Sequence, residues 1–139
     1  MNFLLDTCTI SELVARQPDR RVVDWIDHQN ERCLYLSTVT VGEIARGIAR
    51  LPESRRREEL TTWLQDSLPE RFGDRILALN RSVMMTWGEL VGQCENQGRS
   101  LPVFDSLIAA TALHHQLVVV TRNVRDFEKT GVEVINPWE

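Results

Sequence analysis

The chain has 139 residues, of which 42% are hydrophobic and 26% are charged. This length predicts a single domain over residues 1–139, and the apolar fraction excludes a disordered chain. No apolar run approaches the roughly 18 residues that a membrane span needs, and no signal peptide is evident, so we expect a cytoplasmic protein. The net charge of −4 argues against a protein that holds nucleic acid through a continuous basic surface.

Short β-rich segments alternate with segments of helical periodicity along the chain. In chain order, the expected elements are a strand at residues 2–5, helices from Thr9 and after Pro18, a strand at 33–37, helices at 41–51 and around 60–64, a strand at 76–79, helices at 84–94 and after Pro102, and strands at 117–121 and 132–135. Thr9 and Glu12 have the spacing of a capping box at the first helix start. This alternation predicts a mostly parallel sheet of about five strands, covered by helices on both faces.

Polar side chains follow several of these strands. Asp6 comes directly after the first strand, and Glu43 lies in the first turns of the helix after the second. Asn123 and Asp126 follow the strand at 117–121, while Asp105 opens a helix. Ligands of open parallel sheets bind outside the carboxyl ends of the strands. Acids gathered there repel one another strongly unless a cation lies between them.

Each of these acids also has a structural interpretation. Asp6 could cap the helix that follows it, and Glu43 could form a surface ion pair with Arg46. Asp105 could be an acid that the dipole at a helix start favours, and Asp126 could be a turn residue. The functional interpretation therefore depends on the acids as a set.

The residue types of the set indicate which metal it would bind. Carboxylates without histidine or cysteine partners favour Mg²⁺, with Mn²⁺ as the alternative. The three cysteines are odd in number and form no C-x-x-C pair, so we expect neither disulfides nor a zinc site. The densest basic patch, which could contact RNA or a partner protein or be a solvated helical face, comprises Arg46, Arg50, Arg55, Arg56 and Arg57.

Five segments carry a resemblance to a known family, in family-like order and spacing. They are LLDTCTISEL (4–13), STVTVGEIARG (37–47), PVFDSLIAATA (102–112), VTRNVRDF (120–127) and GVEVINPW (131–138). Together they resemble a PIN domain, and more narrowly the VapC/FitB-type toxins of bacterial toxin–antitoxin pairs. The resemblance implies a three-layer α/β/α fold with a central parallel sheet. It also implies a Mg²⁺-dependent endoribonuclease that cleaves RNA phosphodiester bonds with a metal-activated water.

The resemblance also assigns residues. Those that match the metal-binding and catalytic acids of the family are Asp6, Glu43 and Asp105. Thr7 matches a supporting hydroxyl, whereas Cys8 stands where the family most often has asparagine. Asn123 stands where a fourth acid is frequent, which leaves open whether Asn123 or Asp126 completes the site.

The implied partners are an RNA substrate, a cognate antitoxin and a second copy of the chain, with DNA contacted only through the antitoxin. A homodimer is also expected because the core of so small a chain does not readily hide its large apolar side chains, namely Trp25, Trp63, Trp87, Met84 and Met85. Two alternatives stay open. One is a PIN-like module that binds without catalysis. The other is a haloacid-dehalogenase-like phosphatase, which would need a second aspartate at the position of Cys8.

Overall fold

The computed structural model describes all 139 residues. Its five strands are β1 (Phe3–Leu5), β2 (Leu34–Ser37), β3 (Ile76–Leu77), β4 (Val118–Val120) and β5 (Val134–Ile135). They form one sheet in the order β3-β2-β1-β4-β5, and every pairing is parallel. In the centre, Leu4 of β1 lies between Tyr35 of β2 and Val119 of β4. The expected parallel sheet is confirmed.

Eight α-helices connect and cover the strands. They are α1 (Thr7–Glu12), α2 (Arg20–Asp27), α3 (Thr38–Ala49), α4 (Arg55–Thr62), α5 (Leu68–Phe72), α6 (Arg81–Asn96), α7 (Val103–His115) and α8 (Val124–Glu128). A π-helical segment, Trp63–Ser67, joins α4 to α5, and short 3₁₀ turns precede β2 and β3. None of the helices combines the length and apolarity that crossing a membrane would require.

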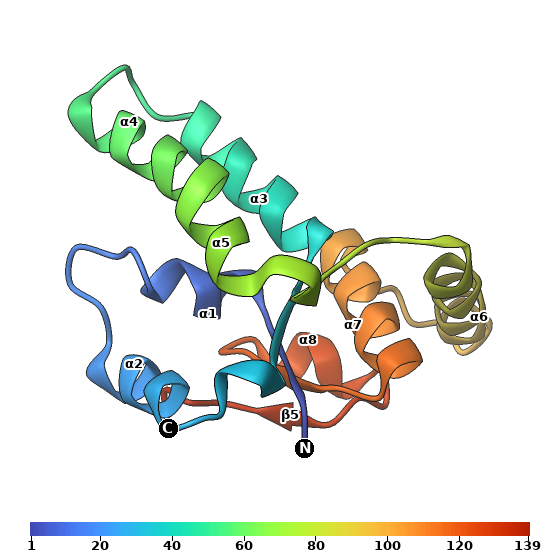
Figure 1. Cartoon of the computed structure of the whole chain (residues 1–139). Coiled ribbons are helices and arrows are strands. Elements are labelled where there is room, and N and C mark those ends of the chain that lie inside the picture. Colours follow the sequence, from blue (N-terminus) through green and yellow to red (C-terminus); the bar gives the residue numbers. More distant parts are fainter.

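The side chains of β1 alternate between the two faces of the sheet, as those of any strand do. Phe3 and Leu5 pack into one apolar cluster with residues of α1, α2 and α5. Leu4 packs into a second cluster with residues of α6, α7 and α8 on the other face. The three layers are visible in Figure 1, so the α/β/α architecture is also confirmed.

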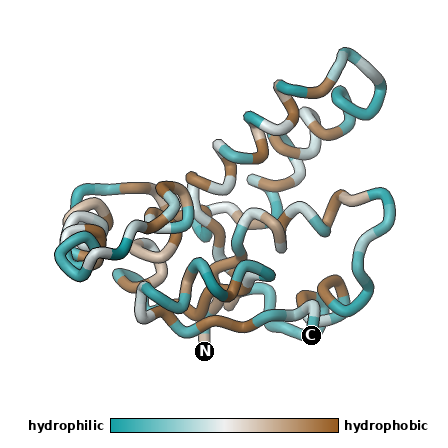
Figure 2. The backbone as a smooth tube through the Cα atoms, turned by 180° about the vertical axis from the view of Figure 1, so that it is seen from behind, coloured by the Kyte–Doolittle hydropathy of each residue, from teal (hydrophilic) through white to brown (hydrophobic).

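Helices α3 and α4 form a hairpin that projects from the sheet (Figure 1), with a hydrophilic turn at its tip (Figure 2). Pro52 lies in that turn, directly after the expected helix at 41–51. Helix α4 begins at Arg55, earlier than the expected helix around 60–64, and Ser54 caps it by accepting a hydrogen bond from the Arg57 amide. The first turns of α4 are mainly charged, so apolar periodicity did not reveal them.

The capping box expected at Thr9 and Glu12 is wrong. Helix α1 begins at Thr7, and its N-cap is Asp6, whose Oδ1 accepts a hydrogen bond from the Thr7 amide at 2.8 Å. Thr9 is fully buried and donates its hydroxyl to the carbonyl oxygen of Val120 at 2.7 Å. Glu12 instead accepts from a backbone amide in the loop before α2. The Thr9 hydroxyl therefore bonds to the neighbouring strand β4 and does not cap the helix.

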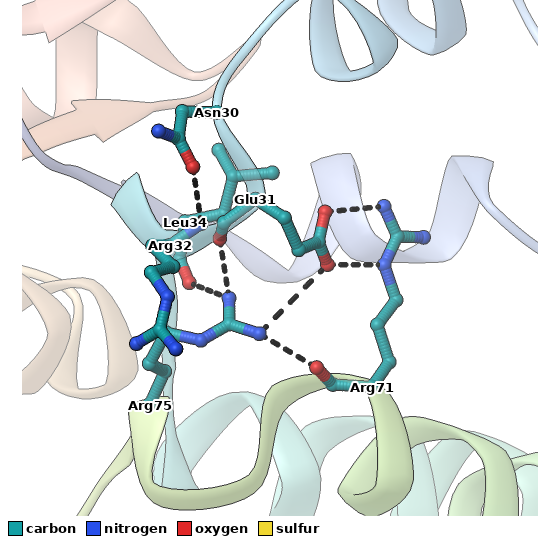
Figure 3. A network of polar contacts seen from close by, with 6 residues as sticks. All are labelled: Asn30, Glu31, Arg32, Leu34, Arg71 and Arg75. Carbon is teal, nitrogen blue, oxygen red and sulfur yellow. Dashed lines mark hydrogen bonds and ion pairs between the residues drawn. The ribbon is translucent and has the colours of Figure 1, made fainter.

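A network around Arg75 holds the edge of the sheet together (Figure 3). Its guanidinium donates to the carbonyl oxygens of Glu31 and Leu34 at 2.6 and 2.7 Å and to that of Arg71 at 2.6 Å. It also stacks 5.2 Å from the centre of the Phe72 ring. Arg71 forms an ion pair with Glu31 at 2.7 Å. One arginine thus ties the turn before β2 to the turn before β3.

Candidate active site

Asp6 lies at the carboxyl end of the central strand β1 and is only 3% exposed. Its Oδ1 accepts from the Thr7 amide, and its Oδ2 accepts from the Thr121 hydroxyl at 2.7 Å and the Cys8 thiol at 3.6 Å. Burial raises the pKa of Asp6, although these three donors partly offset the effect. The carboxylate is therefore fixed in place by groups from two strand ends.

Glu43 lies in α3, half-buried, and faces α1. The Thr7 hydroxyl donates to Glu43 Oε1 at 2.6 Å and lies 3.1 Å from the hydroxyl of Thr40, which is fully buried. Since a hydroxyl has a single hydrogen, Thr7 donates to only one of these two acceptors at a time. Glu43 makes no ion pair with Arg46, so its interpretation as a surface ion-pair partner is wrong.

Asp105 lies in the first turn of α7 and is half-buried. Burial raises its pKa to about 7, together with the negative charges of Asp6, Asp126 and Glu43. A carboxyl group responds in this way only when the other acids are close, because Coulomb interactions weaken with distance and solvent screening. The four acids therefore lie near enough to one another at this edge of the sheet for their charges to interact.

The structure distinguishes the two residues left open as a fourth ligand. Asn123 is exposed, and only its backbone takes part, through an amide that donates to the Thr121 hydroxyl at 2.9 Å. Asp126 lies in the first turn of the short helix α8, not in an isolated turn. The charge of Asp126 raises the pKa of both Asp6 and Asp105. Asp126, and not the uncharged Asn123, therefore affects the pKa of the other acids.

The acids fit a divalent cation by their chemistry but not yet by their spacing. No three acidic, histidine or cysteine side chains lie close enough together to hold a metal ion as they stand, so the expected convergence within one ion's reach is not met. Mutual repulsion favours such a spacing. The donors are carboxylate and hydroxyl oxygens, which suit Mg²⁺ and Mn²⁺. The metal-binding role of Asp6, Glu43 and Asp105 remains a prediction.

Sequence reasoning missed two hydroxyls of this site. Thr121 follows the last residue of β4, and its position at a strand end was the available signal. Thr40 lies three residues before Glu43, on the same side of α3. Cys8, which stands where asparagine was expected, still provides a donor to Asp6, although through a weaker thiol.

The fold and the site define a three-layer α/β/α protein with acids gathered at the carboxyl ends of its central strands. A family model described as the PIN domain matches residues 3–133. The chain belongs to the PIN domain family.

Relatives align along nearly the whole chain. The plasmid stability protein StbB of Pseudomonas syringae pv. tomato is 40% identical over 98% of both chains. The VapC ribonuclease Y4jK of Sinorhizobium fredii is 38% identical over 98% of this chain and 97% of the relative. Toxin FitB of Neisseria gonorrhoeae is 36% identical over 97% of each.

Solved structures give the same result. The crystal structure of FitAcB from Neisseria gonorrhoeae superimposes with a TM-score of 0.92 at 36% identity and covers 99% of both chains. The structure of FitAB bound to an IR36 DNA fragment superimposes with a TM-score of 0.91 at 34% identity, over 99% of this chain and 96% of that one.

Proposed function

We propose that this protein is a divalent-cation-dependent endoribonuclease and the toxin of a type II toxin–antitoxin pair. The observation that carries the proposal is the gathering of Asp6, Glu43, Asp105 and Asp126 at one edge of the sheet, where together with burial the other three acids raise the pKa of Asp105 to about 7. Full-length relatives named as a VapC ribonuclease and as the toxin FitB support it. The proposed substrate, RNA, makes the cytoplasm the proposed compartment.

Asp6, Glu43 and Asp105 would hold the cation, with Asp126 as the fourth acid and Mg²⁺ as the preferred ion. When bound, the cation offsets the charge of the scissile phosphate and makes a water molecule a stronger nucleophile. The all-oxygen donor set suits Mn²⁺ as well, so Mn²⁺ is the alternative ion.

The remaining tasks belong to the side chains of this chain. Thr121 and the Thr7 amide hold the two oxygens of Asp6 in a fixed orientation. The Thr7 hydroxyl donates a hydrogen bond to Oε1 of Glu43. Oε2 of Glu43 accepts no hydrogen bond from the chain, so it is free to act as a ligand or to accept a proton. The site is thus oriented before substrate arrives, which lowers the reorganisation that the reaction requires.

An apolar groove of about 250 Å³ leads away from Thr7 and Glu43 between α1 and the α3–α4 hairpin. Its apolar lining includes Val14, Ala15, Ile44, Ile48, Leu60 and Trp63. We assign this groove to a segment of the cognate antitoxin, because it begins at the acids and an occupant would block RNA from them. The FitA-containing structures that this chain resembles support such a partner, and DNA contact is assigned to the antitoxin.

The homodimer is also part of the proposal, although fewer of the large apolar side chains are available for its interface than expected. Trp25 packs edge-to-face on Phe3 with ring centres 4.9 Å apart, and the Trp87 indole donates to Ser106 at 2.9 Å. These tryptophans therefore serve contacts within the chain. The exposed apolar side chains around the start of α6 and α7 are those of Met84, Met85, Val103 and Phe104.

The decisive experiment is cleavage of single-stranded RNA by the purified protein in Mg²⁺ and in EDTA. We expect the wild type to cleave RNA in Mg²⁺ but not in EDTA. Asp6→Asn, Glu43→Gln and Asp105→Asn should each reduce cleavage at least about 100-fold. Cleavage that persists in EDTA or in all three variants would come from a contaminating nuclease and would overturn the proposal. RNA binding without cleavage would favour the binding-module alternative, and release of phosphate from a phosphomonoester would favour the phosphatase.

A further inference from the structure

A second pocket, of about 320 Å³, opens between α3 and α7. It lies next to the acidic site, because Glu43 lines both and Phe104, on the opposite wall, directly precedes Asp105. This pocket is separate from the groove assigned to the antitoxin, which lies on the α1 side of α3. Nothing in the proposed chemistry requires it.

The wall formed by α7 is aromatic and apolar. Phe104 is 43% exposed, which leaves a large part of its ring accessible to a ligand. Leu107 lies one helical turn further along α7, and Leu79, from the segment after β3, lines the same pocket. These side chains offer an apolar surface with one exposed aromatic ring beside the acids.

The wall formed by α3 carries an arginine side chain, Arg46, that has no ion-pair partner. Arg46 lies three residues after Glu43 and so on the same side of the helix. It is exposed and forms no ion pair or hydrogen bond in the chain. Other arginines of the patch have partners: Arg56 donates to the carbonyl oxygen of Val14, and Arg55 pairs with Glu59.

We propose that this pocket binds a nucleobase of single-stranded RNA adjacent to the scissile phosphate, with the base stacked on Phe104 and a neighbouring phosphate contacted by Arg46. This inference rests on the proposed ribonuclease function and names the part of the substrate that the pocket takes.

General properties of RNA recognition favour this occupant. A chain with net charge −4 gains little affinity from long-range attraction to phosphates, so contacts to bases become important. Proteins bind single-stranded RNA by stacking exposed bases on aromatic side chains and arginines. The pocket volume lies near the lower end of the range for small ligands, roughly 300–1,000 Å³, and so suits one nucleotide unit.

A protein surface is a poorer fit to this pocket. An apolar partner seated over Phe104 would remove Arg46 from water without offering it an anion, which is unfavourable. The more exposed apolar side chains, Met85 at 64% and Val103 at 63%, do not line the pocket. A second copy of the chain is therefore expected to cover those residues, and not the pocket between α3 and α7.

The test measures binding of a fluorescein-labelled single-stranded oligoribonucleotide with Ca²⁺ in place of Mg²⁺, and kcat/KM for its cleavage with Mg²⁺. Phe104→Leu keeps an apolar side chain but removes the ring, and it should weaken both about 5- to 100-fold. Phe104→Trp should retain both. Arg46→Gln should weaken binding and reduce its salt dependence. Leu113→Ala on α7 and Arg50→Gln on α3, both outside the pocket lining, are the matched controls and should leave both unchanged.

An abasic nucleotide moved along the oligonucleotide identifies the stacked base. At one position its effect should be the same size as that of Phe104→Leu, and the two changes together should cost no more than either alone. If no abasic position reduces binding, or if Phe104→Leu binds and cleaves like the wild type, the proposed pocket is wrong. The same holds if Phe104→Leu only changes the sedimentation coefficient, since Phe104 would then contact a second copy.

These results are distinguishable from failure of the proposed function. If the wild type cleaves RNA and Phe104 substitutions change nothing, the ribonuclease stands and the nucleobase pocket falls. If the wild type cleaves no RNA but Phe104-dependent, base-dependent binding is present, the pocket stands and the proposed activity falls.

Discussion

Thr121 donates its hydroxyl to Asp6 Oδ2 at 2.7 Å, and this hydrogen bond links the ends of two neighbouring strands that lie 115 positions apart in the sequence. The same oxygen of Thr121 accepts the Asn123 amide at 2.9 Å. One buried hydroxyl therefore orients the central acid and shapes the turn that leads to α8 and Asp126. Thr121 is a positioning residue in the proposed site.

Thr121→Val keeps the shape of the side chain but removes both contacts. We expect the variant to require more Mg²⁺, with roughly 10-fold weaker cation affinity, because Asp6 is no longer held. Unfolding should become easier by about 1–3 kcal/mol. The measurements are the Mg²⁺ dependence of cleavage and urea denaturation. Thr111→Val is the matched control, since Thr111 is also fully buried but bonds only within α7. An unchanged Mg²⁺ requirement would contradict the positioning role.

Asp105→Asn should abolish cleavage and at the same time stabilise the cation-free protein near neutral pH. The pKa of Asp105 is raised to about 7, first by burial and then by the neighbouring acids, whereas an unfolded aspartate has a pKa of about 3.9. The folded state thus prefers the protonated form, and stability present below about pH 4 is lost as the pH rises towards 7.

Melting temperatures between pH 4 and 8 in EDTA measure this effect. We expect the wild type to lose stability across that range and Asp105→Asn to lose less, so that the variant melts about 3–6 °C higher at pH 7.5. A shallower slope should persist in the variant, because burial also raises the pKa of Asp6. A variant that melts much earlier yet cleaves normally would make Asp105 a structural residue at the helix start and defeat the nuclease proposal.

Arg75→Ala should destabilise the fold without a direct effect on the site. The change leaves three backbone carbonyl oxygens without their donor and removes the stack on Phe72, so we expect a loss of about 2–4 kcal/mol in urea denaturation. Arg71→Ala removes a largely exposed ion pair with Glu31 and should lose about 1 kcal/mol or less. Equal losses in the two variants would show that the ion pair, and not the carbonyl contacts, holds this edge.

Met85→Glu tests the dimer. Met85 is 64% exposed at the start of α6, and a charge there should disfavour an apolar interface while leaving the monomer folded. Sedimentation at tens of micromolar, a concentration at which a specific dimer of roughly micromolar affinity is populated, should show a dimer for the wild type and a monomer for the variant. Leu113→Glu, near the other end of α7, is the control. A monomeric wild type would refute the homodimer.

The sequence alone determined the class of fold. Short β-rich segments that alternate with helical segments can form a parallel sheet only when helices cross over on its faces, so the layers followed from local patterns. The same rule placed Asp6 and Glu43 at one edge, because parallel strands end together, whereas the place of Asp105 depended on how its helix docks. Thr7 was expected beside the acids, and the structure places its hydroxyl 2.6 Å from Glu43.

Only the tertiary structure decided how that edge is arranged. Thr9 was expected to cap α1, but β4 takes its hydroxyl and Asp6 becomes the cap. The sequence left open whether Asp126 is a turn residue or a fourth acid, and α8 brings its charge to Asp105. The role of Thr121 was not foreseen at all. Spacing in the sequence reports contacts within a few residues, whereas Asp6 and Thr9 reach the end of β4 only because β1 pairs with β4.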